Sequence, residues 1–357
     1  MRVTIWDVAR EANVSKSTVS NVLRGKPIVT EATRQVVLET IDRLGYRPSA
    51  AARSLVRRRA QALGVVISDI RDPFCGEIAR AIAVSAAAAG YATILSDLGA
   101  DPPGSATFLD LVPEGRADAL ILAAWPSGAD VVARLGANAY PIAFVACRPC
   151  AGLEADYVDV DERQGVVLAI RHLVELGHRS IGCIARAEDQ AADRLAGFRL
   201  AMAAVGLKVA DRLVVLERPY GEDADFGTLA GYRAAEAILQ TEPRPTAIFA
   251  ADDYLALGAM EAIEAAGFGV PSDISLVGFD DVRFAGLSRI ALTTVHQPRA
   301  LMGRQVTELV LDRLHGPNRG GPRAVILEPQ LTIRGSTGPV PATARRATRS
   351  VEVVLGG

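Results

Sequence analysis

The stretch TIWDVAREANVSKSTVSNVLRG, residues 4–25, carries two short helical patterns joined by a tight turn. Thr4 can cap the first helix. The inward face of that helix is formed by apolar residues at helical spacing, namely Ile5, Val8, Ala9 and Ala12. Asn13 suits the turn, because asparagine adopts a left-handed backbone more readily than most residues. Ser15 can cap the second helix, whose inward stripe consists of Val19, Val22 and Leu23.

A third helical pattern lies between Thr30, which can cap it, and Gly45, which can end it. Its apolar stripe consists of Val36, Val37, Ile41 and Leu44. Three short helices with a tight turn between the first two are typical of a helix-turn-helix. The second helix is polar on its other faces, at Lys16, Ser17, Ser20, Asn21 and Arg24. Such side chains can bond base edges and phosphates in the major groove, and the alternative is a plain three-helix capping bundle.

Charge is distributed unevenly along the 357 residues. Residues 1–59 contain twelve Lys and Arg against five Asp and Glu, a balance of +7. The remainder contains 27 against 36, a balance of −9. A basic N-terminal segment on an acidic body is expected if only that segment meets a polyanion such as DNA. A solvated basic face is the alternative.

The segment YRPSAAARSLVRRR, residues 46–59, follows the third helix. Residues 49–56 are alanine-rich, but they are too few to form a stable helix without a partner. Leu55 is apolar on a segment without a core of its own, as expected of a wedge between base steps in the minor groove. Arg53 and Arg57 to Arg59 would then lie near phosphates. A plain basic linker is the alternative.

The rest of the chain alternates short apolar runs with helical stretches. ALGVVIS, YATILS, ALILAA, PIAFVA, SIGCIA, TAIFAA and SLVGF are almost continuously apolar. Parallel strands that are covered on both faces have this pattern. The sequence therefore predicts an α/β, doubly wound fold that is long enough for two such units.

Ligands of open parallel sheets bind outside the carboxyl ends of the strands. Candidate residues stand at such places: Phe74, Asp161, Asp252, Asp280 and, at the start of a helix, Arg194. Carboxylates and an arginine can grip vicinal hydroxyls, while an aromatic face packs on sugar C–H groups, which favours a carbohydrate over a purine. For each residue a local role is the alternative, because an Asp after a strand commonly caps the next helix and a Phe commonly lies in a core.

Several classes of protein lack support in the sequence. No apolar run has the roughly 20 residues of a membrane helix, and the N-terminus lacks a signal-peptide pattern, so a cytoplasmic location is expected. The pair CRPC, residues 147–150, has no second pair, so neither a zinc site nor any other metal or cofactor is expected. Common phosphate-binding, dinucleotide-binding and hydrolase motifs are missing, so an enzyme is not expected.

The chain resembles the lactose-repressor (LacI-type) family of bacterial transcription regulators over about residues 3–338. The resemblance rests on TIWDVAREANVSKSTVSNVLRG, LGYRPSAAARSL, LGVVISDIRDPF, HLVELGHRSIGCI, PTAIFAADDYLALGAMEAI, VPSDISLVGFDD and LTTVHQP. It implies a helix-turn-helix over 1–46, a hinge helix over 47–59 and a core over 60–338 of the type I periplasmic-binding-protein kind. The first subdomain would take about 60–158 and 293–321, the second about 159–290 and 322–338. Residues 339–357 read as a disordered tail.

The resemblance also implies site residues. Lys16, Ser17 and Asn21 would touch bases, and further DNA contacts would come from Thr4, Thr18, Ser20, Ala52, Arg53 and Leu55. The effector cleft would be lined by Phe74, Asp161, Arg194, Phe226, Asp252, Asp280 and Gln297, with Gln190 as a further candidate in an atypical loop. Asn21 stands where the family often has arginine, so the base preference is expected to shift from guanine to adenine.

The implied function is a repressor that binds a near-palindromic operator as a homodimer or larger assembly. A small molecule in the cleft, best a sugar or sugar derivative, would alter its DNA affinity by linkage. The alternatives are a cytoplasmic sugar-binding protein, an α/β enzyme without a DNA role, and a periplasmic-type solute-binding protein. A steep salt dependence of DNA binding would separate the repressor from all three.

Overall fold

The structure is a computed structural model that describes residues 3–23, 25–46, 59–98, 107–123, 129–137, 140–186, 192–217, 227–316 and 320–341. Some of the predictions fall outside these residues. They concern the hinge helix and the sites Ala52, Arg53, Leu55, Gln190 and Phe226.

Three helices form the N-terminal domain: α1 (Ile5–Glu11), α2 (Lys16–Leu23) and α3 (Glu31–Leu44). Thr4 and Asp7 cap α1 reciprocally: the Thr4 side chain accepts from the Asp7 amide, and the Asp7 carboxylate accepts from the Thr4 amide at 2.9 Å. Asn13 has φ 53°, as predicted for the turn. The domain's core consists of Val8, Ala9, Ala12, Val19, Val22 and Val37.

Two residues of the predicted stripes are exposed instead. Val36 is 48% exposed and Leu23 is 37% exposed. Successive helical residues point about 100° apart, so Val36 cannot share the buried direction of Val37. For the same reason Leu23, the last residue of α2, diverges from the buried Val22.

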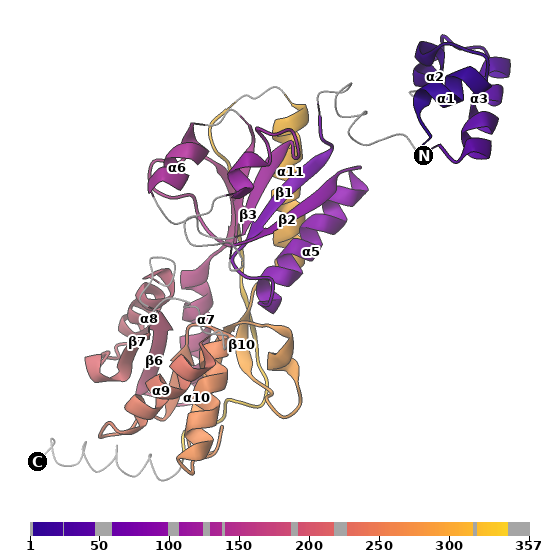
Figure 1. The fold of residues 1–357 in the computed structure, drawn as a ribbon. Coiled ribbons are helices and arrows are strands. Elements are labelled where there is room, and N and C mark those ends of the chain that lie inside the picture. The colour runs from indigo at the N-terminus through magenta and orange to yellow at the C-terminus, as the bar shows by residue number, and fades with distance from the viewer. Residues whose placement is uncertain are drawn as a thin grey trace, which may run out of the picture.

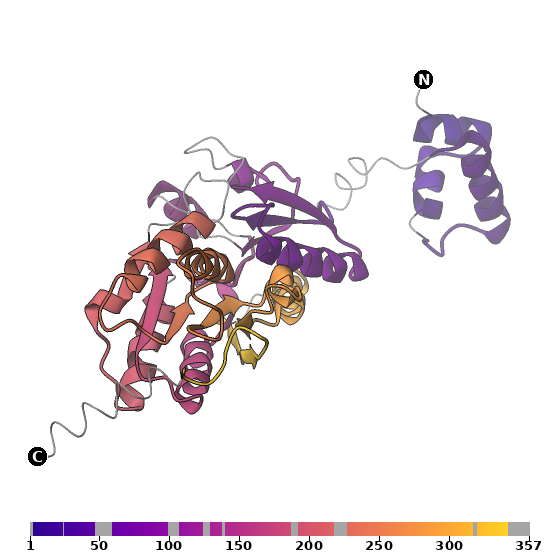
Figure 2. The ribbon, with the colours of Figure 1, turned by 90° about the horizontal axis from the view of Figure 1, so that it is seen from below.

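The first lobe contains a six-stranded sheet with the order β2-β1-β3-β4-β5-β11. Its strands, all paired in parallel, are β1 (Ala62–Ile67), β2 (Ala92–Asp97), β3 (Ala119–Ala123), β4 (Ile142–Val145), β5 (Asp156–Val160) and β11 (Ala324–Leu327). Helices α5 (Pro73–Ala88) and α11 (Arg299–His315) lie side by side over one face (Figures 1 and 2). Helices η1 (Thr107–Asp110) and α6 (Ala129–Gly136) cover the other face.

The second lobe contains another six-stranded sheet, with the order β7-β6-β8-β9-β10-β12. Its strands are β6 (Ile181–Arg186), β7 (Val214–Glu217), β8 (Ala247–Ala250), β9 (Ser275–Asp280), β10 (Thr293–His296) and the antiparallel β12 (Gln330–Thr332). The helices of this lobe are α7 (Glu162–Glu175), α8 (Ala192–Ala204), η2 (Asp211–Leu213), α9 (Thr228–Leu239), α10 (Asp253–Ala265) and η3 (Arg283–Gly286).

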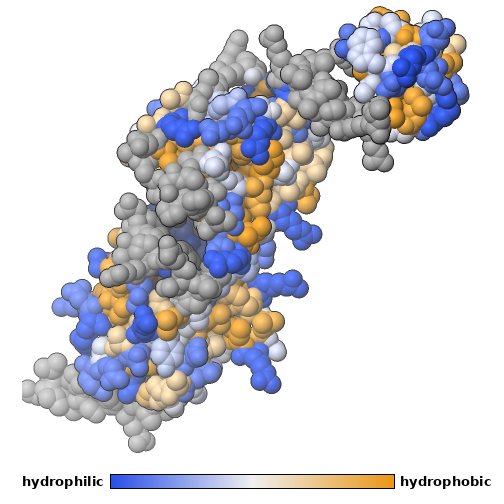
Figure 3. Space-filling view, viewed as in Figure 1, coloured by the Kyte–Doolittle hydropathy of each residue, from blue (hydrophilic) through white to orange (hydrophobic). Residues whose placement is uncertain are grey.

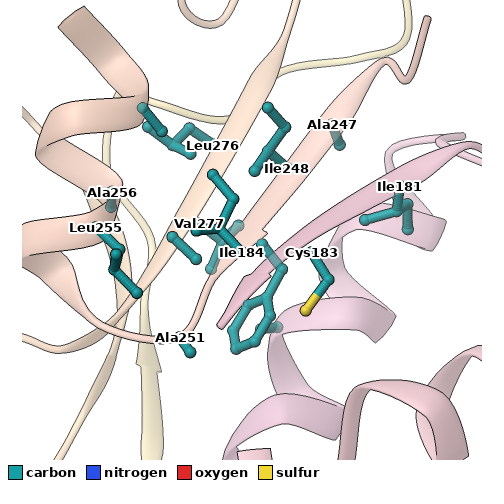
Figure 4. Packing of buried hydrophobic residues seen from close by; sticks show 14 of the residues in the cluster. Ile181, Cys183, Ile184, Ala247, Ile248, Ala251, Leu255, Ala256, Leu276 and Val277 are labelled. Atoms are coloured by element: carbon teal, nitrogen blue, oxygen red, sulfur yellow. The ribbon is translucent and has the colours of Figure 1, made fainter. Parts of the chain in front are cut away.

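Packing in the second lobe follows from the apolar runs. Figure 4 shows Ile184 and Ile248 on neighbouring strands, and Leu255 on the helix beside them. Buried side chains from both faces of the sheet join one continuous cluster. The predicted α/β, doubly wound fold is confirmed, because continuous apolar strands can be buried only between two helical layers.

The described elements cross between the lobes three times: after β5, after β10 and after β11. This corrects the predicted boundaries. Residues 293–296 form β10 of the second sheet, where Val295 lies opposite Phe279, although they were expected in the first subdomain. Residues 324–327 pair with β5 of the first sheet, although they were expected in the second subdomain. Both short strands obtain their backbone partners only in these sheets.

The predicted disordered tail also begins too early. The amide of Val340 donates to the carbonyl of Leu176 at 3.2 Å, and Val340 packs near Gly177. Most of the predicted tail, residues 342–357, lies outside the described residues. Among the described helices, none combines the length and the apolar character needed to span a membrane.

Candidate DNA-binding helix and ligand cleft

Helix α2 presents its first turn to solvent. Ser15 caps this helix, because its hydroxyl accepts from the Thr18 amide at 3.1 Å. Lys16 and Ser17 are exposed, whereas Thr18, Ser20 and Asn21 are half-buried. Lys16 Nζ lies 5.2 Å from the centroid of the Trp6 ring, and Trp6 is itself 65% exposed. Polar side chains are thus held on a compact domain at positions that a partner can reach.

The strand order of both sheets creates a switch point, where helices after neighbouring strands leave in opposite directions and a crevice opens. In the second lobe this point lies between the ends of β6 and β8. Arg186 ends β6, and its Nε donates to Asp252 Oδ2 at 2.9 Å. Asp252 also caps α10 by accepting from the Leu255 amide at 2.7 Å. The two side chains are only 6% and 5% exposed, so the pair is desolvated.

Arg194, in the first turn of α8, is surrounded by acceptors. Its guanidinium donates to Glu162 at 2.7 Å and to the carbonyl of Ala251 at 2.5 Å, and it lies 3.1 Å from Asp280. It also stacks 4.0 Å from the centroid of the Phe279 ring. A planar guanidinium suits such a site, because its donors form a rigid fork and its face packs on aromatic rings.

Burial changes the protonation of the acids around Arg194. Burial raises the pKa of Glu162 to about 6, although the Arg194 guanidinium opposes this shift. Burial also raises the pKa of Asp280, again against the effect of Arg194, and the nearby Asp252 adds to the increase. For both acids, burial therefore outweighs the opposing effect of the Arg194 guanidinium on the pKa.

Asp280 and Asp281 form an unusual turn at the end of β9. Their φ angles are 108° and 53°, values that non-glycine residues seldom adopt. Asp280 accepts from the amide of the buried Gln297 at 2.7 Å. Burial alone would raise the pKa of Asp281, but hydrogen bonds from His296 and Arg334 outweigh burial and lower it to about 2.

The first lobe contributes the start of α5. Asp72 caps this helix by accepting from the Phe74 amide at 2.9 Å. Burial raises the pKa of Asp72 to about 6, and the charges of Asp280 and Asp252 in the other lobe add to that shift. Tyr254 of α10 is affected by the same three acids, because burial and then their charges raise its pKa. The charges of Asp280 and Asp252 thus act on Asp72 across the boundary between the lobes.

A second contact between the lobes lies at Arg148, which follows β4. Its Nε donates to Asp159 at 3.0 Å, and its Nη1 lies 3.3 Å from Asp193 of α8. Arg163 of α7 also donates to Asp193, at 2.8 Å. Arg148 is exposed, so this contact lies at the rim of the cleft.

The structure brings together four of the predicted cleft residues: Arg194, Asp252, Asp280 and Gln297. Phe74 lies nearby, 5.7 Å from the guanidinium of Arg299. Asp161 is exposed and caps α7 through the Gln164 amide at 2.9 Å, which is the local role open to it from the start. Figure 3 shows a recess between the two lobes in which hydrophilic residues are visible.

Sequence reasoning missed several residues of this cluster, namely Asp72, Glu162, Arg186, Tyr254 and Arg299. Asp72 had a usable signal, since an Asp before Pro73 marks a helix start after the first strand. Arg186 also ends a predicted apolar strand. Arg299 had none, because its role depends on the crossing between the lobes. The described residues contain no cluster of His, Cys, Asp and Glu that could hold a metal, and all four cysteines are free thiols.

Two family models match the chain. The bacterial regulatory proteins of the lacI family match residues 4–49, and the periplasmic binding protein-like domain matches residues 170–337. The HTH-type transcriptional repressor PurR of Klebsiella pneumoniae (strain 342) is 35% identical over 338 residues, which cover 93% of this chain and 96% of the relative.

Solved structures give the same result. The lac repressor dimer bound to operator and the anti-inducer ONPF has a TM-score of 0.81 at 27% identity, covering 95% of this chain and 100% of that chain. The CelR–cellobiose complex, of a transcriptional regulator, has a TM-score of 0.67 at 29% identity, covering 94% and 100%. The matches extend over the N-terminal helices and both lobes. This chain belongs to the lacI family of bacterial regulatory proteins and is a DNA-binding transcriptional regulator controlled by a small-molecule effector.

Proposed function

We propose that the effector is an uncharged carbohydrate held between the lobes. The observation that carries this proposal is the set of buried Arg–acid pairs at the carboxyl ends of the second sheet, Arg186–Asp252 and Arg194–Asp280. Paired acids and guanidinium groups place acceptors and donors side by side, and vicinal hydroxyls can exchange with the bonds between them. Phe74 at the start of α5 offers an apolar face for sugar C–H groups, and CelR, a structural relative, was solved with cellobiose.

The charge of the cleft argues against anionic sugars. Asp72, Asp252 and Asp280 interact with one another across the lobes. A phosphate or carboxylate placed among them would have to compete with Asp252 and Asp280 for Arg186 and Arg194, which already pair with those acids, and would meet their like charge. Sugar phosphates and sugar acids are therefore expected to bind much more weakly than neutral sugars of the same size.

For DNA, we propose that α2 reads the major groove of a near-palindromic operator, with the protein acting as a dimer. Lys16, Ser17 and Asn21 would contact bases, and Thr4, Thr18 and Ser20 would contact the backbone. The hinge contacts proposed for Ala52 and Leu55 would add the minor groove, and Arg53 would lie near phosphates. The exposed first turn of α2 supports this arrangement.

A calorimetric panel tests the effector class. Cellobiose, D-ribose, glucose 6-phosphate and adenine would be titrated into the full chain, in parallel with thermal unfolding. We expect a neutral sugar to bind and to raise the melting temperature, and Asp280→Asn to weaken this binding at least tenfold. Asp211→Asn is the matched control, because Asp211 is exposed in the same lobe. Binding of adenine or the sugar phosphate in preference to both neutral sugars would refute the proposal.

A further inference from the structure

The turn at Asp280 and Asp281 needs external support. Asp280 and Asp281 are two consecutive non-glycine residues with positive φ, and such a turn persists only where its surroundings impose it. The Asp281 amide donates to Thr294 at 3.3 Å, and the Val282 amide donates to Asp253 at 2.9 Å. These bonds come from within the second lobe. They do not restrain the two carbonyl groups of the turn.

The carbonyl groups are held by a residue of the first lobe. Arg299, the first residue of α11, donates to the carbonyl of Asp280 and, at 2.8 Å, to that of Asp281. Its third nitrogen, Nε, donates to Glu77 of α5 at 2.6 Å. Arg299 is 7% exposed, whereas the side chain of its partner Glu77 is 43% exposed, so the guanidinium is buried and its bond to Glu77 lies at the solvent edge. One buried guanidinium therefore links the strained turn of one lobe with a helix of the other.

The two helices at the other end of this link are tightly packed. A Cβ atom on Gly303 of α11 would lie 2.6 Å from the Cβ of Ala81 and 3.1 Å from the carbonyl oxygen of Ile78, both on α5. Backbones in such close contact cannot slide past one another without losing that packing. Helices α5 and α11 thus move together. Because Arg299 is bonded both to α5 and to the turn, a displacement of the two helices displaces the carbonyl groups of the turn.

We propose that Arg299 is the positioning residue that ties the Asp280–Asp281 turn to α5, so that displacement of the Asp280 carboxylate and rotation of the lobes are one motion. The proposal rests on the proposed function in one respect, namely that Asp280 contacts the effector. A ligand that binds and displaces the Asp280 carboxylate then also displaces the start of α5 through the Arg299 guanidinium. The same contact works in reverse, because coupling between two sites is reciprocal.

Amide hydrogen exchange on the full chain without ligand tests the tie. Arg299→Met removes the donors and keeps most of the stem, whereas Arg304→Met is the matched control on an exposed position of the same helix. We expect Arg299→Met to speed exchange of the Asp281 and Val282 amides by about tenfold or more, given the strength of hydrogen bonds to charged groups. The exchange rate of amides in the first turns of α5 should rise as well. Urea unfolding of each variant gives its global stability, and the rise should exceed what the loss of global stability explains.

Two further variants separate the tie from mere support of the turn. Glu77→Gln should speed amide exchange in α5. It should change the exchange rate of the Asp281 amide less than Arg299→Met does. Arg299→Lys should restore protection only in part, because an ammonium group cannot reach three acceptors in a fixed fork. The proposal is overturned if Arg299→Met affects the turn no more than Arg304→Met, or if α5 is unaffected. Since no sugar is present, this result is independent of the effector class, which the calorimetric panel decides.

Discussion

Helix α2 and the cleft use the same kinds of polar side chain in opposite environments. On α2, Lys16 and Ser17 are exposed. In the cleft, Arg186 and Asp252 are at most 6% exposed and bonded to each other. The first arrangement leaves donors for a polyanion, which supplies its own acceptors and releases counterions. The second pairs its charges with one another, because an unpaired buried charge is too costly.

The difference indicates how each region selects its partner. A ligand of the cleft must replace or extend the bonds between the paired arginines and acids. The cleft therefore selects its ligand by geometry and charge. The DNA-facing helix forms its bonds only with the partner, so a large part of its affinity is electrostatic and depends on salt. Variants that remove one member of a buried ion pair in the cleft should therefore affect stability strongly, and variants on α2 should affect only binding.

The largest effect is expected for Arg194→Met. It leaves Glu162 and Asp280 without their cation in a desolvated place, and losing one member of such a group costs about 3 kcal/mol of unfolding free energy. The loss should be smaller at pH 5 than at pH 8, since both acids have raised pKa values and can bind protons. Urea unfolding at both pH values measures it. Arg163→Met, which breaks an ion pair whose arginine side chain is 58% exposed, should cost less than 1 kcal/mol. Equal losses of unfolding free energy in Arg194→Met and Arg163→Met would show that buried and solvated ion pairs do not differ in their contribution to stability.

An intermediate effect is expected for Asn21→Ala on α2. We expect a loss of about 1–3 kcal/mol in operator binding and relaxed preference at one base pair, with unchanged stability. Fluorescence anisotropy on a selected operator and on its single-base variants measures both quantities. Arg10→Ala, at an exposed position of α1, serves as the contrast, because it removes a positive charge and no proposed base contact. A uniform loss on every sequence would show that Asn21 does not read a base.

The smallest effect is expected for Asp72→Asn. The pKa of Asp72, about 6, exceeds its unfolded value, so the folded chain retains a proton that the unfolded chain has already released between about pH 4 and pH 6. Stability is therefore lost as the pH rises through this window. Asn retains the helix cap without a charge, and it should raise stability by about 1 kcal/mol at pH 7.5 and little at pH 4. Asp211→Asn, at an exposed position, should show no such pH dependence. Equal gains at both pH values would mean that the charge of Asp72 is not the cause.

Local patterns were enough for the N-terminal domain and for most strands. The caps Thr4 and Thr30 and the left-handed Asn13 depend on neighbours within four residues, and all three are found where the sequence predicts them. Val36 and Leu23 were misplaced, because apolar character does not specify which of two adjacent residues faces a small core. The predicted cluster of Arg194, Asp252 and Asp280 followed from their places at strand ends.

The sequence by itself determined the alternation of elements, the helix-turn-helix pattern and the polar residues at strand ends, because these depend on periodicity and near neighbours. Only the tertiary structure decided that β10 belongs to the second sheet and β11 to the first. It alone also brought Arg299 to carbonyl groups 18 and 19 residues away and to Glu77, 222 residues away. Such contacts form where two folded lobes meet, and no local pattern in the chain encodes the distance between them.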